Sequence, residues 1–125
     1  MAAGCAMLKQ LRERKGEVYP RLEKLSGELV AGVAAAAKEA GIALCHNRVG
    51  SMLTWFFQAG PVTDWDTASK SDTEAFGKFF RSMLDQGVYL PASQYEAAFL
   101  GATHSEDDVQ RTVGAAKQAF AGMRK

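Results

Sequence analysis

Apolar residues recur every three or four positions between residues 18 and 40, and this spacing predicts a long helix with one buried side. The apolar positions are Val18, Leu22, Leu25, Leu29, Val33, Ala36 and Ala40. We expect this helix to begin after Gly16, with Pro20 in its first turn, where a missing amide hydrogen bond is tolerated. Gly41 is expected to end it, because glycine readily adopts the left-handed conformation found at helix C-termini.

Helical spacing also starts at residue 1, with no Ser, Thr, Asp or Asn in front to cap the first amides. A helix without a cap suggests that the chain is cut from a longer one. Another helix is predicted up to Gly87, opened by Ser71 and Glu74 as a capping box. Its apolar side would consist of Phe76, Phe79, Phe80, Met83 and Leu84.

The last predicted helix begins at Ser105, and the three acidic residues after it suit the positive end of a helix dipole. Its apolar positions are Val109, Val113, Ala116 and Phe120. We expect its last turn to carry Arg124 and Lys125.

Between the helices the pattern changes to short strands. Residues 42–49 and 52–57 predict an antiparallel hairpin around Gly50 and Ser51, and the bulky second strand is expected to be covered on both faces. Residues 88–90 and 94–99 predict two more strands, and residues 58–70 a loop with at most one short turn. The sequence therefore predicts a single α+β domain over residues 1–125, a small, mainly antiparallel sheet with helices packed on one face.

Composition argues against several classes of function. The net charge of +1 over 125 residues gives no electrostatic argument for binding nucleic acid or an anionic membrane. No apolar run approaches the about 20 residues needed to cross a bilayer. The two cysteines fit a reducing compartment better than a disulfide framework.

Metal and nucleophile chemistry find little support. Cys5, Cys45, His46 and His104 are a conceivable zinc set, but Cys45 and His46 are adjacent in a predicted strand and point apart. Nothing favours a Cys45–His104 nucleophile pair over a buried, inert cysteine. Arg48 has the donors to bind a substrate carboxylate, but an ion pair within its own domain is the favoured interpretation. We therefore predict no metal site.

Glu96 is the strongest candidate for chemistry. In an alternating strand, Tyr95, Ala97 and Phe99 share one face, while Gln94 and Glu96 share the other. Glu96 would then point away from the aromatic side, either into a cleft or into solvent. Both interpretations remain open from the residues alone.

Four segments of the chain share their order and spacing with one known family. They are Met1–Gly4, Asn47–Met52, Ser71–Leu84, and Gly87–Phe99 (GVYLPASQYEAAF) with the nearby His104–Asp108. In these segments the chain resembles the C-terminal part of the glutamate-1-semialdehyde 2,1-aminomutases, which are of the class III aminotransferase type. It departs from the family pattern at Ser51, Pro91, Ala92 and Ala98.

The resemblance implies that the chain is the C-terminal portion of a larger fold-type I enzyme that uses pyridoxal 5'-phosphate. The Schiff-base lysine and the phosphate-binding loop would precede Met1 in the parent enzyme, so this chain alone is expected to contribute no cofactor-binding residue and to be inactive. Glu96 is implied to be catalytic, holding or gating the amino group near cofactor and substrate. Ser93 and Gln94 are implied to bind substrate.

The implied parent is an isomerase that converts glutamate 1-semialdehyde to 5-aminolevulinate in porphyrin (tetrapyrrole) biosynthesis. The resemblance further implies a small-molecule substrate, no nucleic acid or membrane partner, a homodimer, and a cytoplasmic location, or a plastid in a photosynthetic eukaryote. Two alternatives stay open: another class III aminotransferase, and an interaction module without chemistry of its own. A domain cut from a larger one should expose apolar residues, expected here at residues 1–11 and 55–57, and should self-associate.

Overall fold

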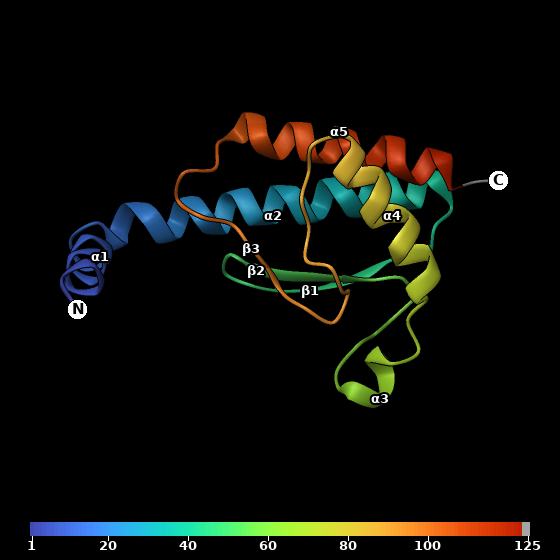
Figure 1. Cartoon of the computed structure of the whole chain (residues 1–125), viewed down its shortest axis with the longest axis horizontal. Coiled ribbons are helices and arrows are strands. Elements are labelled where there is room, and N and C mark those ends of the chain that lie inside the picture. Colours follow the sequence, from blue (N-terminus) through green and yellow to red (C-terminus); the bar gives the residue numbers. More distant parts are fainter. Residues whose placement is uncertain (124–125) are drawn as a thin grey trace.

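The computed structural model describes residues 1–123 (Figure 1). In chain order its elements are α1 (Ala2–Glu13), α2 (Lys15–Ala40), β1 (Cys45–Val49), β2 (Met52–Phe56), α3 (Trp65–Ala68), α4 (Thr73–Asp85), β3 (Ala98–Phe99) and α5 (Glu106–Gly122). The predicted last turn with Arg124 and Lys125 lies outside the described residues.

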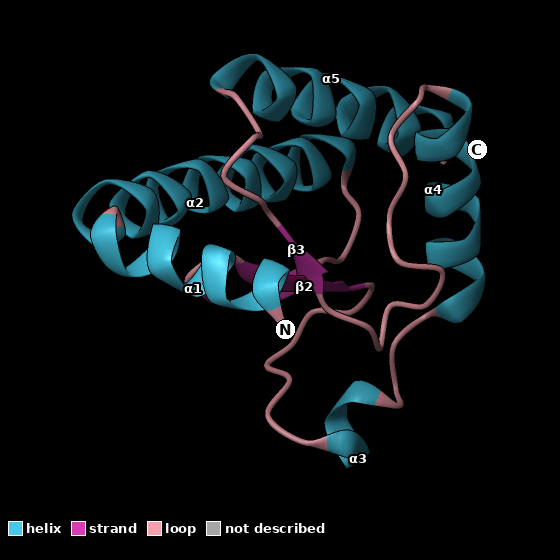
Figure 2. Cartoon of the chain, turned by 60° about the vertical axis from the view of Figure 1, so that its left-hand side comes forward, coloured by secondary structure: helices cyan, strands magenta, loops and turns pink. Residues whose placement is uncertain are grey.

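The three strands form one antiparallel sheet in the order β1-β2-β3. Helices α2, α4 and α5 lie on one side of this sheet, whereas the short helix α3 lies on the other (Figures 1 and 2). The hairpin between β1 and β2 turns at Gly50, whose φ of 56° requires the conformational freedom of glycine. The predicted α+β fold, a small antiparallel sheet with the long core helices on one face, is confirmed; the short helix α3 is the exception.

The main core fills the space between the sheet and these three helices. Leu53 and Trp55 of β2, followed by Phe57, face this core, because alternate residues of a strand point to the same side. At its centre Phe79 of α4 and Phe120 of α5 stack, with ring centroids 4.8 Å apart and ring planes at 15°. Helix packing therefore rests on aromatic side chains that are 1% and 0% exposed.

The opposite face of the sheet is covered at one end only. There Phe56 packs against Val62 and Ala68 from the loop around α3. Toward the hairpin turn, Met52 and its register partner Phe99 are 41% and 66% exposed. The expected cover on both faces is thus confirmed for the bulky residues 53 and 55–57, which are 1% to 8% exposed, while Met52 at the start of the strand is exposed.

Helices α2 and α5 approach each other closely at Gly32. A β-carbon added to Gly32 would lie 2.6 Å from Cγ2 and 3.0 Å from Cγ1 of Val113 on α5. These separations are shorter than carbon–carbon contact distances of about 3.5 to 4.0 Å. Val113 cannot rotate away easily, because a β-branched side chain has one strongly preferred rotamer in a helix.

Gly32→Ala is therefore expected to lower the free energy of unfolding by about 1 kcal/mol, because the cost of overpacking exceeds the gain in helix propensity. Urea denaturation measures this change. Gly114→Ala on α5 is the matched control, since nothing lies within 4 Å of an added β-carbon there, and it should stabilise the protein. If Gly32→Ala remained destabilising in a Val113→Ala background, the assigned clash would be the wrong cause.

Two predicted helix starts are wrong. Helix α2 begins at Lys15, so Pro20 lies inside the helix rather than in its first turn. Because proline has no amide hydrogen, the Gly16 carbonyl lacks its helical partner, but Gly16 is exposed and water can solvate it. Helix α4 is capped by Asp72, which accepts from the Ala75 amide at 2.8 Å. Ser71 is instead buried and accepts from Gln58 Nε2 at 2.7 Å.

Two predicted strands are also wrong. Residues 88–90 are not in a strand, and only Ala98–Phe99 of the second segment pair with the sheet, opposite Leu53 and Met52. A strand needs a partner edge, and residues 93–96 instead form a turn.

The apolar surface is smaller than expected. Residues 55–57 are 4% to 8% exposed, so their predicted exposure is wrong. Helix α1 has no buried residue, which confirms the expectation for residues 1–11, and Met7 and Leu8 are 61% and 68% exposed. Self-association of the chain stays a prediction.

Candidate functional site

Glu96 lies in a turn. Its backbone amide donates to the Ser93 carbonyl at 3.1 Å, and the Tyr95 amide donates to the Ser93 hydroxyl at 3.2 Å. The alternating strand that fixed the predicted direction of Glu96 is therefore absent, and that part of the prediction is wrong. The residue is exposed, and its carboxylate has no hydrogen-bond or ion-pair partner within residues 1–123.

The structure brings the three predicted site residues together. Ser93, Gln94 and Glu96 line one small cleft of about 20 Å³, which the edge of β2 also borders. Thr54 of β2 donates its hydroxyl to the Glu96 carbonyl at 3.3 Å. Thr54 has no sequence signal of its own, because its contact depends on the turn passing beside β2.

Gln94 differs from its two neighbours in being only 2% exposed. Its Oε1 accepts a hydrogen bond from the Phe57 amide at 3.1 Å. Its Nε2 is buried and has no partner in the part of the chain that the structure describes. The side chain thus ties the Glu96 turn to the end of β2, and a role in substrate binding stays a prediction.

A second contact holds the turn from the far side of the sheet. Tyr95 packs against Trp65 of α3 with ring centroids 5.2 Å apart and ring planes at 62°. Both rings are partly exposed, at 40% and 65%. Edge-on aromatic pairs of this geometry are favourable.

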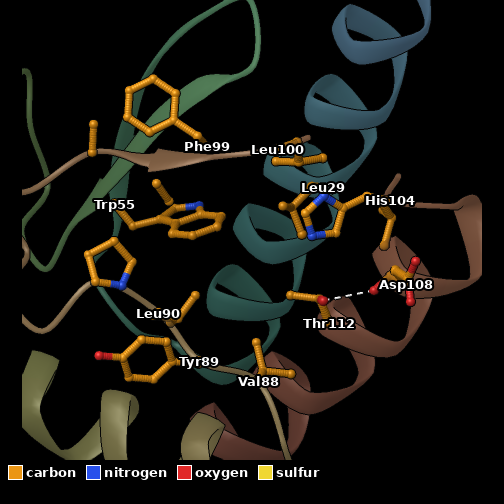
Figure 3. Close-up of a pocket in the computed structure, with 14 residues that line it drawn as sticks. Leu29, Trp55, Val88, Tyr89, Leu90, Phe99, Leu100, His104, Asp108 and Thr112 are labelled. Carbon is orange, nitrogen blue, oxygen red and sulfur yellow. Dashed lines mark hydrogen bonds between the residues drawn. The ribbon is translucent and has the colours of Figure 1, made fainter. Parts of the chain in front are cut away.

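A larger groove opens next to this turn (Figure 3). Its volume is about 350 Å³, and apolar side chains from α2, β2, α5 and residues 88–100 form most of its lining. Trp55 lies in the middle of the groove, between Phe99 and Leu90, with His104 and Asp108 at the side formed by α5 (Figure 3). No local sequence pattern predicts this groove, because only the tertiary fold assembles its lining.

His104 and Asp108 of the groove are engaged in local structure, whereas Trp55 Nε1 is buried and has no hydrogen-bond partner among residues 1–123. The Gly101 amide donates to His104 Nδ1 at 2.9 Å, which fixes the ring. Hydrogen bonds from Ser105 lower the pKa of Asp108, whose Oδ2 accepts from the Ser105 amide at 2.8 Å. Asp108 thereby completes the capping box of α5, so its main role is structural.

Arg48 pairs within its own domain, as the favoured interpretation had it. Its Nη2 lies 2.7 Å from Oε1 of Glu23, and its Nη1 donates to the Gly50 carbonyl at 3.0 Å. The hydrogen bond from Arg48 lowers the pKa of Glu23. These contacts join α2 to the β1–β2 turn and occupy the guanidinium.

Cys45 has the environment of a structural cysteine. It is half-buried on β1, and burial raises the pKa of its thiol. A raised pKa disfavours the thiolate that acts as nucleophile or metal ligand. His46, the next residue on the strand, is exposed.

Neither the cleft at Glu96 nor the adjoining groove fits pyridoxal phosphate. Every lysine among residues 1–123 is exposed, so none lies in an apolar pocket. The cleft at Glu96 is far smaller than the about 300 Å³ at which ligand pockets begin. The groove is large enough, but its lining contains no lysine or arginine to meet a phosphate. No step of cofactor chemistry is therefore assigned to these residues.

Comparison with known proteins gives a consistent result. The chain is 53% identical over 125 residues to a glutamate-1-semialdehyde 2,1-aminomutase from Anaeromyxobacter dehalogenans strain 2CP-C, covering 100% of this chain and 28% of the relative. It is 51% identical over 124 residues to the protein of the same name from Acidobacterium capsulatum, covering 99% of this chain and 29% of the relative. The chain is homologous to the C-terminal portion of these aminomutases. No protein-family model matches it.

Solved structures show the same fold. A glutamate-1-semialdehyde-aminomutase from Pseudomonas aeruginosa PAO1 matches with a TM-score of 0.73 at 18% identity, over 87% of this chain and 24% of that one. An omega-transaminase from Sphaerobacter thermophilus matches with a TM-score of 0.73 at 20% identity, over 92% of this chain and 26% of that one. The two relatives at 51% and 53% identity confirm the aminomutase resemblance noted in the sequence, and the solved structures show that the fold is shared with transaminases. Among residues 1–123, no helix is long and apolar enough to span a membrane.

Proposed function

We propose that residues 1–125 are the C-terminal domain of a pyridoxal-phosphate-dependent glutamate-1-semialdehyde 2,1-aminomutase. This isomerase moves an amino group within glutamate 1-semialdehyde to give 5-aminolevulinate, the precursor of porphyrins. The observation that carries the proposal is the 53% identity to a protein of that name over 100% of the chain. The chain spans less than a third of that relative, so the cofactor would be held elsewhere in the enzyme.

The part played by this chain follows from the contacts of Glu96. Its carboxylate is exposed and unpaired among the described residues, although its backbone is held by Thr54 and Ser93. A fixed backbone with an available charge suits a group that holds a substrate ammonium beside the reacting atoms. Ser93 lines the same cleft, and its hydroxyl already accepts from the Tyr95 amide. Glu96 is therefore the proposed catalytic residue, and Ser93 and Gln94 the proposed substrate contacts.

The resemblance supplies the remaining parts of the proposal. The whole enzyme would be a homodimer in the cytoplasm, or in the plastid of a photosynthetic eukaryote, acting on a small molecule and not on nucleic acid or a membrane. The nearest alternative is another class III aminotransferase, which the shared fold with an omega-transaminase supports. An interaction module without chemistry of its own is the second alternative.

Assay of the full-length protein that carries this chain separates these possibilities. With pyridoxal phosphate it should convert glutamate 1-semialdehyde to 5-aminolevulinate, while the 125-residue chain alone should not. Titration of the isolated chain with the cofactor should give no stoichiometric lysine adduct by absorbance and mass spectrometry. Amino transfer between two different molecules without 5-aminolevulinate would favour the aminotransferase alternative. Inactivity toward every amino donor would favour the module.

A further inference from the structure

The loop that carries α3, residues 58–72, is closed at its base. The Asp72 amide donates to the Phe57 carbonyl at 3.0 Å, where the chain returns to the end of β2. Gln58 Nε2 donates to Ser71 Oγ at 2.7 Å and to the Thr67 carbonyl at 3.0 Å. We call residues 58–72 the α3 loop. Its two ends are joined by direct hydrogen bonds.

The interior of the α3 loop is also fixed. Asp64 and Thr67 form a capping box, with the Thr67 amide donating to Asp64 Oδ1 at 2.9 Å. Val62 and Ala68 pack against Phe56 on the outer face of the sheet. The α3 loop is therefore an ordered support rather than a loose connection.

The α3 loop and the Glu96 turn meet at one residue. The Phe57 amide donates to Gln94 Oε1 in the turn, while the Phe57 carbonyl accepts from Asp72 at the base of the loop. The ring contact between Trp65 and Tyr95 joins the same two segments again. Two separate contacts thus bracket the turn that presents Glu96.

Trp65 has no evident role in the core. It is 65% exposed and belongs to neither buried cluster, and its ring contact is with Tyr95, next to Glu96 in sequence. A large aromatic side chain on the surface that touches this turn bears on local geometry more than on the stability of the domain.

We propose that Trp65 is a positioning residue for Glu96: through Tyr95, and together with the Gln94–Phe57 hydrogen bond, the α3 loop fixes the turn that carries the carboxylate. The kinetic consequence rests on the proposed function, whereas the structural consequence does not. A small displacement of a catalytic group strongly reduces the reaction rate, so removing the Trp65 side chain should lower the turnover of the enzyme.

The kinetic test uses the full-length enzyme with Trp65→Ala, the conservative Trp65→Phe, and Tyr19→Ala as the matched control. Tyr19 is a 54% exposed aromatic residue on α2, away from the turn. We expect Trp65→Ala to lower kcat/KM about tenfold, Trp65→Phe to restore it to within about twofold, and Tyr19→Ala to change nothing. In a Glu96→Gln background Trp65→Ala should have no further effect, because the residues act on one step. A purely structural role would leave the two effects additive.

Hydrogen exchange of the 125-residue chain, followed by NMR, tests the positioning without any reaction. Trp65→Ala should speed exchange of the Glu96 amide, which donates to Ser93, while Tyr19→Ala should not. If Trp65→Ala speeds exchange of the Glu96 amide but the full-length protein lacks aminomutase activity, the positioning is upheld and the proposed function is refuted. Unchanged exchange, or an active enzyme that tolerates Trp65→Ala within about twofold, would overturn the positioning.

Discussion

Glu96→Gln in the full-length enzyme is expected to reduce the rate of 5-aminolevulinate formation by about 30-fold to 1000-fold, or about 2 to 4 kcal/mol. Glutamine keeps the size and shape of the side chain and removes its charge. The exposed carboxylate has no partner within residues 1–123, so the substitution leaves no other charge of the described chain unpaired. Steady-state kinetics with glutamate 1-semialdehyde measures the loss, and circular dichroism checks that folding is intact.

A matched control is available on α4. Glu74 is also exposed and pairs with Lys78 at 2.8 Å, so Glu74→Gln removes one carboxylate charge away from the turn. Fully exposed pairs of this kind contribute little to stability, so both the rate and the free energy of unfolding should hardly change. A wild-type rate for Glu96→Gln would make Glu96 an ordinary solvated glutamate. An equal loss in both variants would point to net charge as the cause.

Phe120→Ala is expected to lower the free energy of unfolding by about 3 to 5 kcal/mol, a large share of the about 5 to 15 kcal/mol typical of a domain. Phe120 is 0% exposed and stacks on Phe79, and its ring centroid lies 6.2 Å from that of Phe57. Truncating Phe120 therefore opens a cavity between α4, α5 and the sheet. Urea denaturation followed by circular dichroism measures the change. The large effect follows from lost transfer free energy combined with the cavity.

Phe99→Ala is the control for this prediction, because Phe99 is 66% exposed on β3. Surface substitutions of this kind usually change stability by less than about 0.5 kcal/mol. Comparable losses for both variants would mean that the Phe79–Phe120 stack is not the centre of the folded core.

Sequence patterns predicted the parts of the fold that depend on local spacing. The apolar stripe of α2, the glycine turn at Gly50 and the Ser105 cap of α5 are all found, because each follows from neighbours a few residues apart. The cap of α4 was misassigned because the Ser71 hydroxyl is taken by Gln58, a partner that only the folded chain brings near. The alternating pattern around Glu96 failed because alternation alone supplies no neighbouring strand for pairing.

The candidate site was predictable only in part. Glu96, Ser93 and Gln94 lie within four consecutive residues, so their shared cleft follows from the turn. Thr54 and Trp65 reach the same turn from segments 30 or more positions away in the sequence, and neither carries a local pattern of its own. Long-range contacts of this kind have no signature in a single sequence.

The two hydrogen bonds at Phe57 differ in how much amino-acid variation they tolerate. The bond from position 72 comes from a backbone amide, so any residue except proline can supply it, and replacing Asp72 would remove the α4 cap without opening the base of the loop. The Phe57 amide donates to a side-chain oxygen at position 94, so only a residue with an acceptor at the same reach can replace Gln94. We therefore expect the base of the loop to tolerate any residue except proline at position 72, while position 94 needs a side-chain acceptor.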